Sequence, residues 1–94
     1  MLIELYEIKK RNNGYALEPI FINPQHIIML TEDLQTKTAL LEGKINLGIN
    51  KAADFTRVKI NETNSVSEVV VVGSPKSIQS KIYKRLPNKT LLRG

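Results

Sequence analysis

The residues of this 94-residue chain that could do acid–base or metal chemistry are few. His26 is the single histidine, and Glu32 and Asp33 follow it along the chain. Zinc sites use three or four nitrogen or sulfur ligands, and the chain contains no cysteine. His26 stands close to Pro24 and directly before Ile27, a context typical of a turn or of the start of a strand. The sequence therefore predicts no metal site.

The side chains also show neither an activated nucleophile nor a pair of converging carboxylates, the groups that a hydrolytic enzyme would use. Seven serines and threonines lie between Thr56 and Ser80, but no histidine lies near them in the sequence to activate a hydroxyl. Glu32 and Asp33 are adjacent, so in a strand they would point to opposite faces, and in a loop both would be solvated. Hydrolysis by paired carboxylates needs two that converge across a cleft, and a domain of this size seldom encloses one. We expect a non-enzymatic protein without a cofactor.

The stretch EVVVVGSPKSIQSKI, residues 68–82, reads as a strand that passes through a glycine into a helix. Helix N-termini bind phosphate through free backbone N–H groups. Here, however, Pro75 removes one donor, and the hydroxyl of Ser74 is placed to cap another. There is a single glycine, Gly73, and not the glycine-rich spacing of a dinucleotide or P-loop motif. The stretch therefore predicts a capped structural corner in preference to a phosphate site.

The charge of the chain is unevenly distributed. Residues 1–68 contain eight Lys or Arg and nine Asp or Glu, a net charge of −1, whereas residues 69–94 contain six basic residues and no acid, a net charge of +6. Such asymmetry is typical of proteins that bind a polyanion. The residues predicted to contact nucleic acid or another polyanion are Lys76, Lys81, Lys84, Arg85, Lys89 and Arg93, with Arg57 and Lys59 as an extension if their strand face lies nearby.

Two other interpretations of the sequence stay open. The basic segment can be a solvated helix face with a frayed tail. Alternatively, the chain can be a homo-oligomeric assembly module, of phage or bacterial type, because small β-rich domains gain burial by pairing and edge strands accept partner strands. Such an oligomer could hold an anionic small molecule, such as a nucleotide, between its subunits.

The elements that must position these residues are mainly strands. Leu2–Lys9 and Tyr15–Ile22 flank Asn13-Gly14, a strong hairpin signal, and Pro19 marks the second of these strands as an edge strand or a bulged one. The other predicted strands are His26–Thr31, Phe55–Ile60 with period-2 alternation, and Glu68–Val72, whose consecutive valines suggest burial on both faces or in a subunit interface.

The sequence predicts one helix clearly and leaves a second region ambiguous. After Pro75, Ile78, Ile82 and Leu86 recur every four residues and form one apolar stripe, and Pro87-Asn88 would end this helix. For residues 32–54 the sequence allows either a short helix over Leu34–Leu41 or a hairpin of Thr38–Glu42 with Lys44–Ile49. We favour the hairpin, with its turn at Glu42-Gly43.

Together these signals predict an α+β domain, a mostly antiparallel sheet of five to seven short strands with one C-terminal amphipathic helix. Residues 1–86 form one small β-rich domain, and residues 87–94 form a basic tail whose composition permits disorder. The absence of cysteine fits a reducing cytoplasm, and the longest apolar run, residues 69–73, is too short to cross a membrane.

Three segments carry a resemblance to a known family. Asn23-Pro24 before an apolar strand that includes Ile27, the strand residues Thr56, Val58 and Ile60, and the strand–helix end with Val72, Ser74, Ile78 and Ile82 resemble the pattern of small FlbD-type domains. The resemblance covers about half of the chain and leaves out the first hairpin, residues 32–54 and the tail. It implies a small β-rich fold of the kind found in flagellar operons and in small phage or bacterial proteins, and it implies no catalytic residue.

Overall fold

The computed structural model of the chain describes residues 1–85 and consists of a five-stranded antiparallel sheet with two α-helices and one short 3-10 helix. Its elements in chain order are β1 (Ile3–Arg11), β2 (Gly14–Ile22), η1 (Pro24–His26), β3 (Ile27–Glu32), α1 (Leu34–Leu41), β4 (Phe55–Glu62), β5 (Ser65–Val72) and α2 (Pro75–Arg85). A small antiparallel β-rich domain, as the sequence predicts, is thereby confirmed.

The strand order in the sheet is β2-β1-β5-β4-β3. Strands that follow one another in the chain are neighbours except for β2 and β3, which form the two edges and are joined through η1. The edge position of β2 confirms the prediction made from Pro19, since an edge strand has no ladder partner on its outer side. Two strands are longer than predicted, since β4 runs to Glu62 and β5 begins at Ser65.

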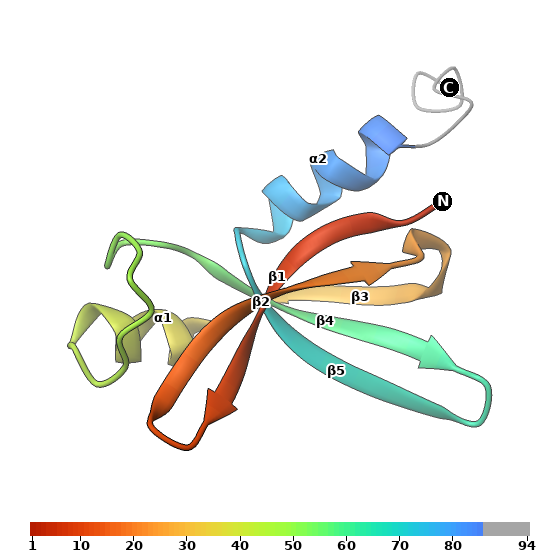
Figure 1. Cartoon of the computed structure of the whole chain (residues 1–94). Coiled ribbons are helices and arrows are strands. Elements are labelled where there is room, and N and C mark those ends of the chain that lie inside the picture. Colours follow the sequence, from red (N-terminus) through yellow and green to blue (C-terminus); the bar gives the residue numbers. More distant parts are fainter. Residues whose placement is uncertain (86–94) are drawn as a thin grey trace.

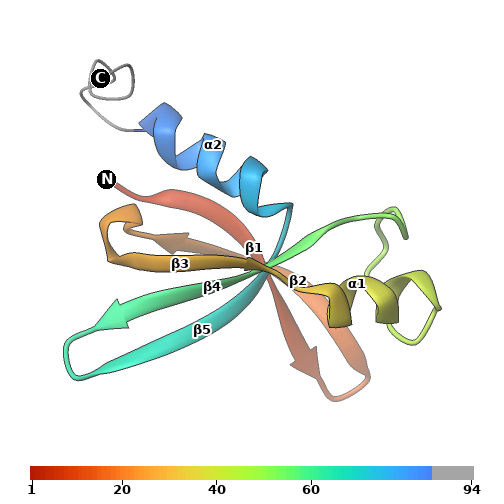
Figure 2. The same cartoon turned by 180° about the vertical axis from the view of Figure 1, so that it is seen from behind.

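The first and last strands, β1 and β5, are neighbours inside the sheet. They pair antiparallel, with Glu7 opposite Val71. The β1–β2 and β4–β5 hairpins therefore diverge from a common crossing point (Figure 1). Viewed from either side, α2 runs beside the N-terminal part of β1, whereas α1 lies by the other end of that strand (Figure 2). The two helices thus occupy opposite ends of the twisted sheet.

The hydrophobic core lies between α2 and one face of the sheet. It contains Ile3, Leu5, Ile22, Val58, Val71 and Ile78. Alternation along β4 places Val58 on this face and Phe55 on the opposite one, where Phe55 is fully buried and Leu40 of α1 is also buried. Each helix therefore covers part of a different face of the sheet.

The prediction for residues 32–54 was wrong, because the chain forms α1 there and not a hairpin, so the described chain has two α-helices and not one. Asp33 caps α1, its carboxylate accepting a hydrogen bond from the N–H of Thr36 at 3.2 Å. Gly43, which we assigned to a hairpin turn, follows the helix at φ +78°, and the N–H of Lys44 donates to the carbonyl of Ala39 at 2.8 Å. A glycine at positive φ suits a helix C-terminus as well as a hairpin, which is why the pattern was ambiguous.

No helix among residues 1–85 is long and apolar enough to cross a membrane.

Candidate nucleic-acid interface

The corner between β5 and α2 fixes the position of the basic helix. The hydroxyl of Ser74 accepts a hydrogen bond from the N–H of Ser77 at 3.1 Å, and the Ser77 hydroxyl donates to the Ser74 carbonyl at 2.8 Å. The N–H of Gly73 donates to the Asp54 carbonyl at 2.8 Å. The capped corner predicted from the sequence is therefore confirmed. The backbone N–H groups of Gly73 and Ser77 are used in hydrogen bonds within the protein.

The apolar stripe of α2 determines which of its residues face solvent. Ile78 is buried in the core and Ile82 packs against it, so the helix lies with this side on β1 and β3. Lys76, Lys81 and Lys84 lie away from the stripe and are exposed. We call these three residues the α2 lysine face.

One of these lysines is held by the sheet. The ammonium of Lys81 donates a hydrogen bond to the carbonyl oxygen of Glu4 in β1, at 3.3 Å. Lys81 and Lys84 flank a small hollow beside Ile3 and Glu4. Both lysines therefore lie beside the start of β1.

The α2 lysine face has no acidic partner among the described residues. The ion pairs among residues 1–84 are Lys9–Glu7, Arg11–Glu18, Lys37–Asp54, Lys44–Glu42 and Arg57–Asp33. All of them lie in the strands, in α1, at its N-cap Asp33 or in the segment that connects α1 to β4, and none involves Lys76, Lys81 or Lys84. The cationic charge of this helix is consequently left for solvent or for an external anion.

The predicted extension of this surface by Arg57 and Lys59 does not follow from the geometry. Val58 faces α2 as part of the core, and side chains alternate along a strand, so Arg57 and Lys59 lie on the opposite face of the sheet. Arg57 is also engaged, because its guanidinium contacts Asp33 at 3.4 Å and the side-chain oxygen of Gln35 at 3.3 Å. The sheet separates these two residues from the α2 lysine face.

Asp33, the partner of Arg57, is a buried acid with several hydrogen-bond donors around it. Burial acts to raise the pKa of Asp33, but the hydrogen bonds from the hydroxyl and N–H of Thr36, together with the Arg57 guanidinium, outweigh it and lower that pKa below its ordinary value. Nearby, the hydrogen bond and the charge of Asp54 raise the pKa of Lys37. The Arg57–Asp33 and Lys37–Asp54 pairs join the N-terminal half of α1 to β4 and to the residue before it. They were not predicted from the sequence because their partners are 24 and 17 residues apart.

The other three residues predicted to contact nucleic acid, Arg85, Lys89 and Arg93, lie at or beyond the end of α2. Arg85 is the last residue of α2, and Lys89 and Arg93 lie outside the described residues, as does the predicted tail 87–94. Within residues 1–85 no group of three His, Asp or Glu side chains is placed to hold a metal ion.

A second concave region, which the sequence did not indicate, lies between the end of β2, η1 and the end of β4. We call it the β2–β4 hollow. The residues that line it are Phe21, Ile22, Asn23, His26, Ile60, Asn61, Glu62 and Thr63. His26, for which the sequence predicts a turn or the start of a strand, is the last residue of η1 and directly precedes β3.

Comparison of this chain with protein-family models, with curated proteins and with solved structures finds no significant match. The resemblance to FlbD-type domains therefore stays a prediction.

Proposed function

We propose that this chain is a non-enzymatic module that binds nucleic acid through phosphate contacts made by α2. The observation that carries the proposal is the α2 lysine face, three exposed ammonium groups on one anchored helix with no acidic partner in the described chain. The net charge of +5 adds a long-range attraction to polyanions.

The chemistry of these side chains favours backbone contacts over base recognition. A lysine ammonium is a hydrated point charge and lacks the planar fork with which arginine pairs to a base edge. Tyr83 is the aromatic residue of α2 and is partly exposed, but one aromatic ring offers little for stacking of successive bases. The proposed binding is therefore electrostatic and tolerant of sequence.

Binding of this kind is tested by its dependence on salt. Each phosphate contact contributes about −0.9 to the slope of log K against log salt for B-DNA. Fluorescence anisotropy of a labelled duplex, titrated at several salt concentrations, gives this slope for the parent chain. Changing Lys76, Lys81 and Lys84 together to Gln is expected to reduce its magnitude by about 2 to 3 and to lower affinity at low salt.

A matched variant controls for net charge alone. Lys10, Lys44 and Lys51 are exposed and lie away from α2, so changing these three to Gln removes the same charge from a different surface. We expect this control to keep most of the parent slope. Equal slopes for the two triple variants would contradict the proposal, since binding would then depend on total charge and not on α2.

A second candidate function, assembly with further copies of the chain, is favoured by apolar side chains left in solvent. On α1, Leu40 is buried, but Leu34 and Leu41 are 60% and 59% exposed. On the edge strand β3, Ile28 and Met29 are also exposed. An edge strand and an adjoining apolar helix face together suit strand addition or helix packing by a second copy.

The assembly candidate is tested by sedimentation equilibrium of the parent chain and of a variant with Leu34→Ser and Leu41→Ser. A parent oligomer that dissociates in the variant would support it. Val66→Ser is the control, because Val66 is equally exposed but lies on β5 next to the β4–β5 turn. A parent chain that is monomeric at its highest attainable concentration would exclude this candidate.

A further inference from the structure

We infer that the β2–β4 hollow is a binding site for an aliphatic primary ammonium group. The hollow has a volume of about 600 Å³, which lies within the usual range for small-molecule sites. It gathers residues from two stretches of the chain, 21–26 and 60–63, that the sheet topology brings together. The inference concerns a surface formed by β2, η1 and β4, and it is independent of the nucleic-acid proposal.

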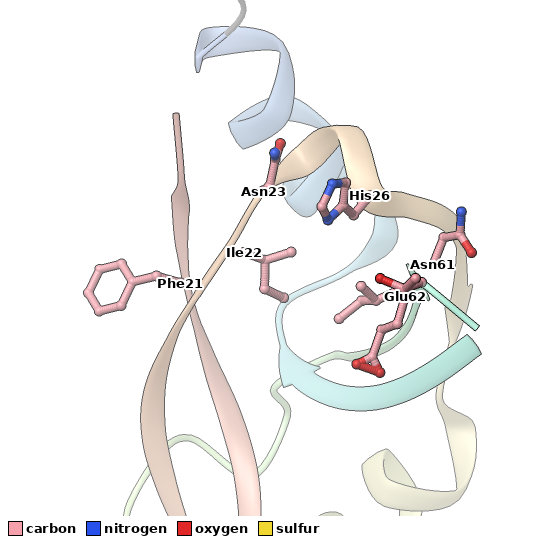
Figure 3. A pocket seen from close by; sticks show the side chains of 8 residues that line it. Phe21, Ile22, Asn23, His26, Asn61 and Glu62 are labelled. Carbon is pink, nitrogen blue, oxygen red and sulfur yellow. The ribbon is translucent and has the colours of Figure 1, made fainter. Parts of the chain in front are cut away.

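The floor of the hollow is aliphatic. Ile22 is a member of the buried core and Ile60 packs against that core, so the core reaches the surface at this end of the sheet. In Figure 3 the side chain of Ile22 projects into the hollow. Phe21, which also lines the hollow, has its ring on the other side of β2 from Ile22 (Figure 3), as strand alternation requires. A short methylene chain can remove water from this floor on binding.

The wall of the hollow supplies hydrogen-bonding groups and one formal charge. The imidazole of His26 faces the hollow from η1, and Glu62 reaches it from β4 (Figure 3). Asn23 is held in place at η1, since its side-chain oxygen accepts from the N–H of Gln25 at 2.9 Å. Glu62 takes part in none of the ion pairs among residues 1–84.

The sign of that charge selects the ligand. Glu62 is the only Asp, Glu, Lys or Arg that lines the hollow within the described chain, and a carboxylate pairs with an ammonium through charge-assisted hydrogen bonds. The aliphatic floor then favours an ammonium carried on methylene groups over a bare cation. A free aliphatic amine and the side chain of a lysine both have this chemistry.

The test is an NMR titration of the full ¹⁵N-labelled chain at neutral pH and constant ionic strength, with butylammonium, 1-butanol and butyrate as probes of equal chain length. We expect saturable shifts at residues 21–26 and 60–63 with butylammonium, and about fivefold weaker binding of the uncharged alcohol, the scale of one exposed ion pair. N-acetyl-lysine N-methylamide distinguishes the two sources, since it binds as well as butylammonium only if the hollow admits a lysine side chain.

Two variants separate the Glu62 charge from general electrostatics. Glu62→Gln is expected to lower the affinity for butylammonium about fivefold, with the amide spectrum showing that the fold is kept. Glu68→Gln removes an exposed acid on the opposite sheet face and is expected to change nothing. Equal binding of the three probes, equal effects of the two variants, or the absence of saturable shifts at these residues would each overturn the inference.

Discussion

The carboxylate of Asp33 lies 3.4 Å from the guanidinium of Arg57 and so joins the N-terminus of α1 to the strand β4. The same carboxylate accepts a hydrogen bond from the Thr36 hydroxyl at 2.6 Å, and its side chain is almost completely buried. One acid therefore caps α1, pairs with the guanidinium of Arg57 and connects the helix to β4. Several properties of the domain depend on it.

Replacement of Asp33 is expected to destabilise the domain. Asp33→Ala removes the helix cap and leaves Arg57 without its carboxylate, and we expect a loss of about 2 kcal/mol in the free energy of unfolding. Asp33→Asn keeps a capping oxygen, so its loss should be smaller. Urea denaturation followed by circular dichroism measures both. Equal stability of the parent and the Ala variant would show that α1 is held mainly by the packing of Leu40.

Asp33 should also make stability depend on pH. Because the folded state lowers its pKa below the ordinary value of 3.8, the charged form contributes stability above that value, and the contribution is lost as pH falls through the folded pKa. The difference in unfolding free energy between the parent chain and Asp33→Asn should therefore be constant from neutral pH to about pH 5 and shrink below about pH 4. Urea titrations across this range measure the difference. A constant difference at all pH values would contradict the lowered pKa.

Gly73, at the corner between β5 and α2, should not tolerate a side chain. Its φ is +118°, and a Cβ atom there would lie 2.9 Å from the Ser77 hydroxyl and 3.2 Å from Cδ1 of Ile78. We expect Gly73→Ala to lower the unfolding free energy by about 2 to 3 kcal/mol. Gly43→Ala is the matched control, since Gly43 also has positive φ but open space around it, and it should cost about 1 kcal/mol. Thermal denaturation that ranks the two equally would show that the corner adjusts to the added methyl group.

Ile78 anchors α2 and thereby its lysines. It is 1% exposed within the core, and Ile78→Ala is expected to cost about 2 to 4 kcal/mol. Because Ile78 connects the helix to the sheet, amide hydrogen exchange should increase most in α2. The exposed Ser80, on the same helix, provides the control, and Ser80→Ala should be neutral or slightly stabilising. Faster exchange in the β1–β2 hairpin than in α2 would contradict this role.

Much of the sheet could be predicted from the sequence because its signals are local. Asn13-Gly14 joins β1 to β2 with Gly14 at φ +130°, and the alternation of Thr56, Val58 and Ile60 marks the buried face of β4. The corner at Ser74 could also be predicted, since an N-cap and a proline at the first helical position act within one turn of the helix.

Helix α1 and the face of Arg57 could not be predicted in the same way. The leucines of α1 fall on more than one side of the helix, with Leu40 buried and Leu34 and Leu41 exposed, so there is no single apolar stripe to read. Alternation shows that Arg57 and Val58 face opposite ways, but not which face α2 covers. That choice is made by packing between elements far apart in the sequence.

The position of β1 between β2 and β5 has a consequence for how the chain folds during its synthesis. A nascent polypeptide leaves the ribosome from its N-terminus, so the β1–β2 hairpin can form while the rest is still being synthesised. Its neighbour β5, however, supplies Val71 opposite Glu7 and emerges late. Contacts between residues distant in sequence form slowly because loop closure costs entropy before it is compensated. Completion of the sheet is therefore expected to wait until translation has passed β5, long after its neighbour β1 has left the ribosome.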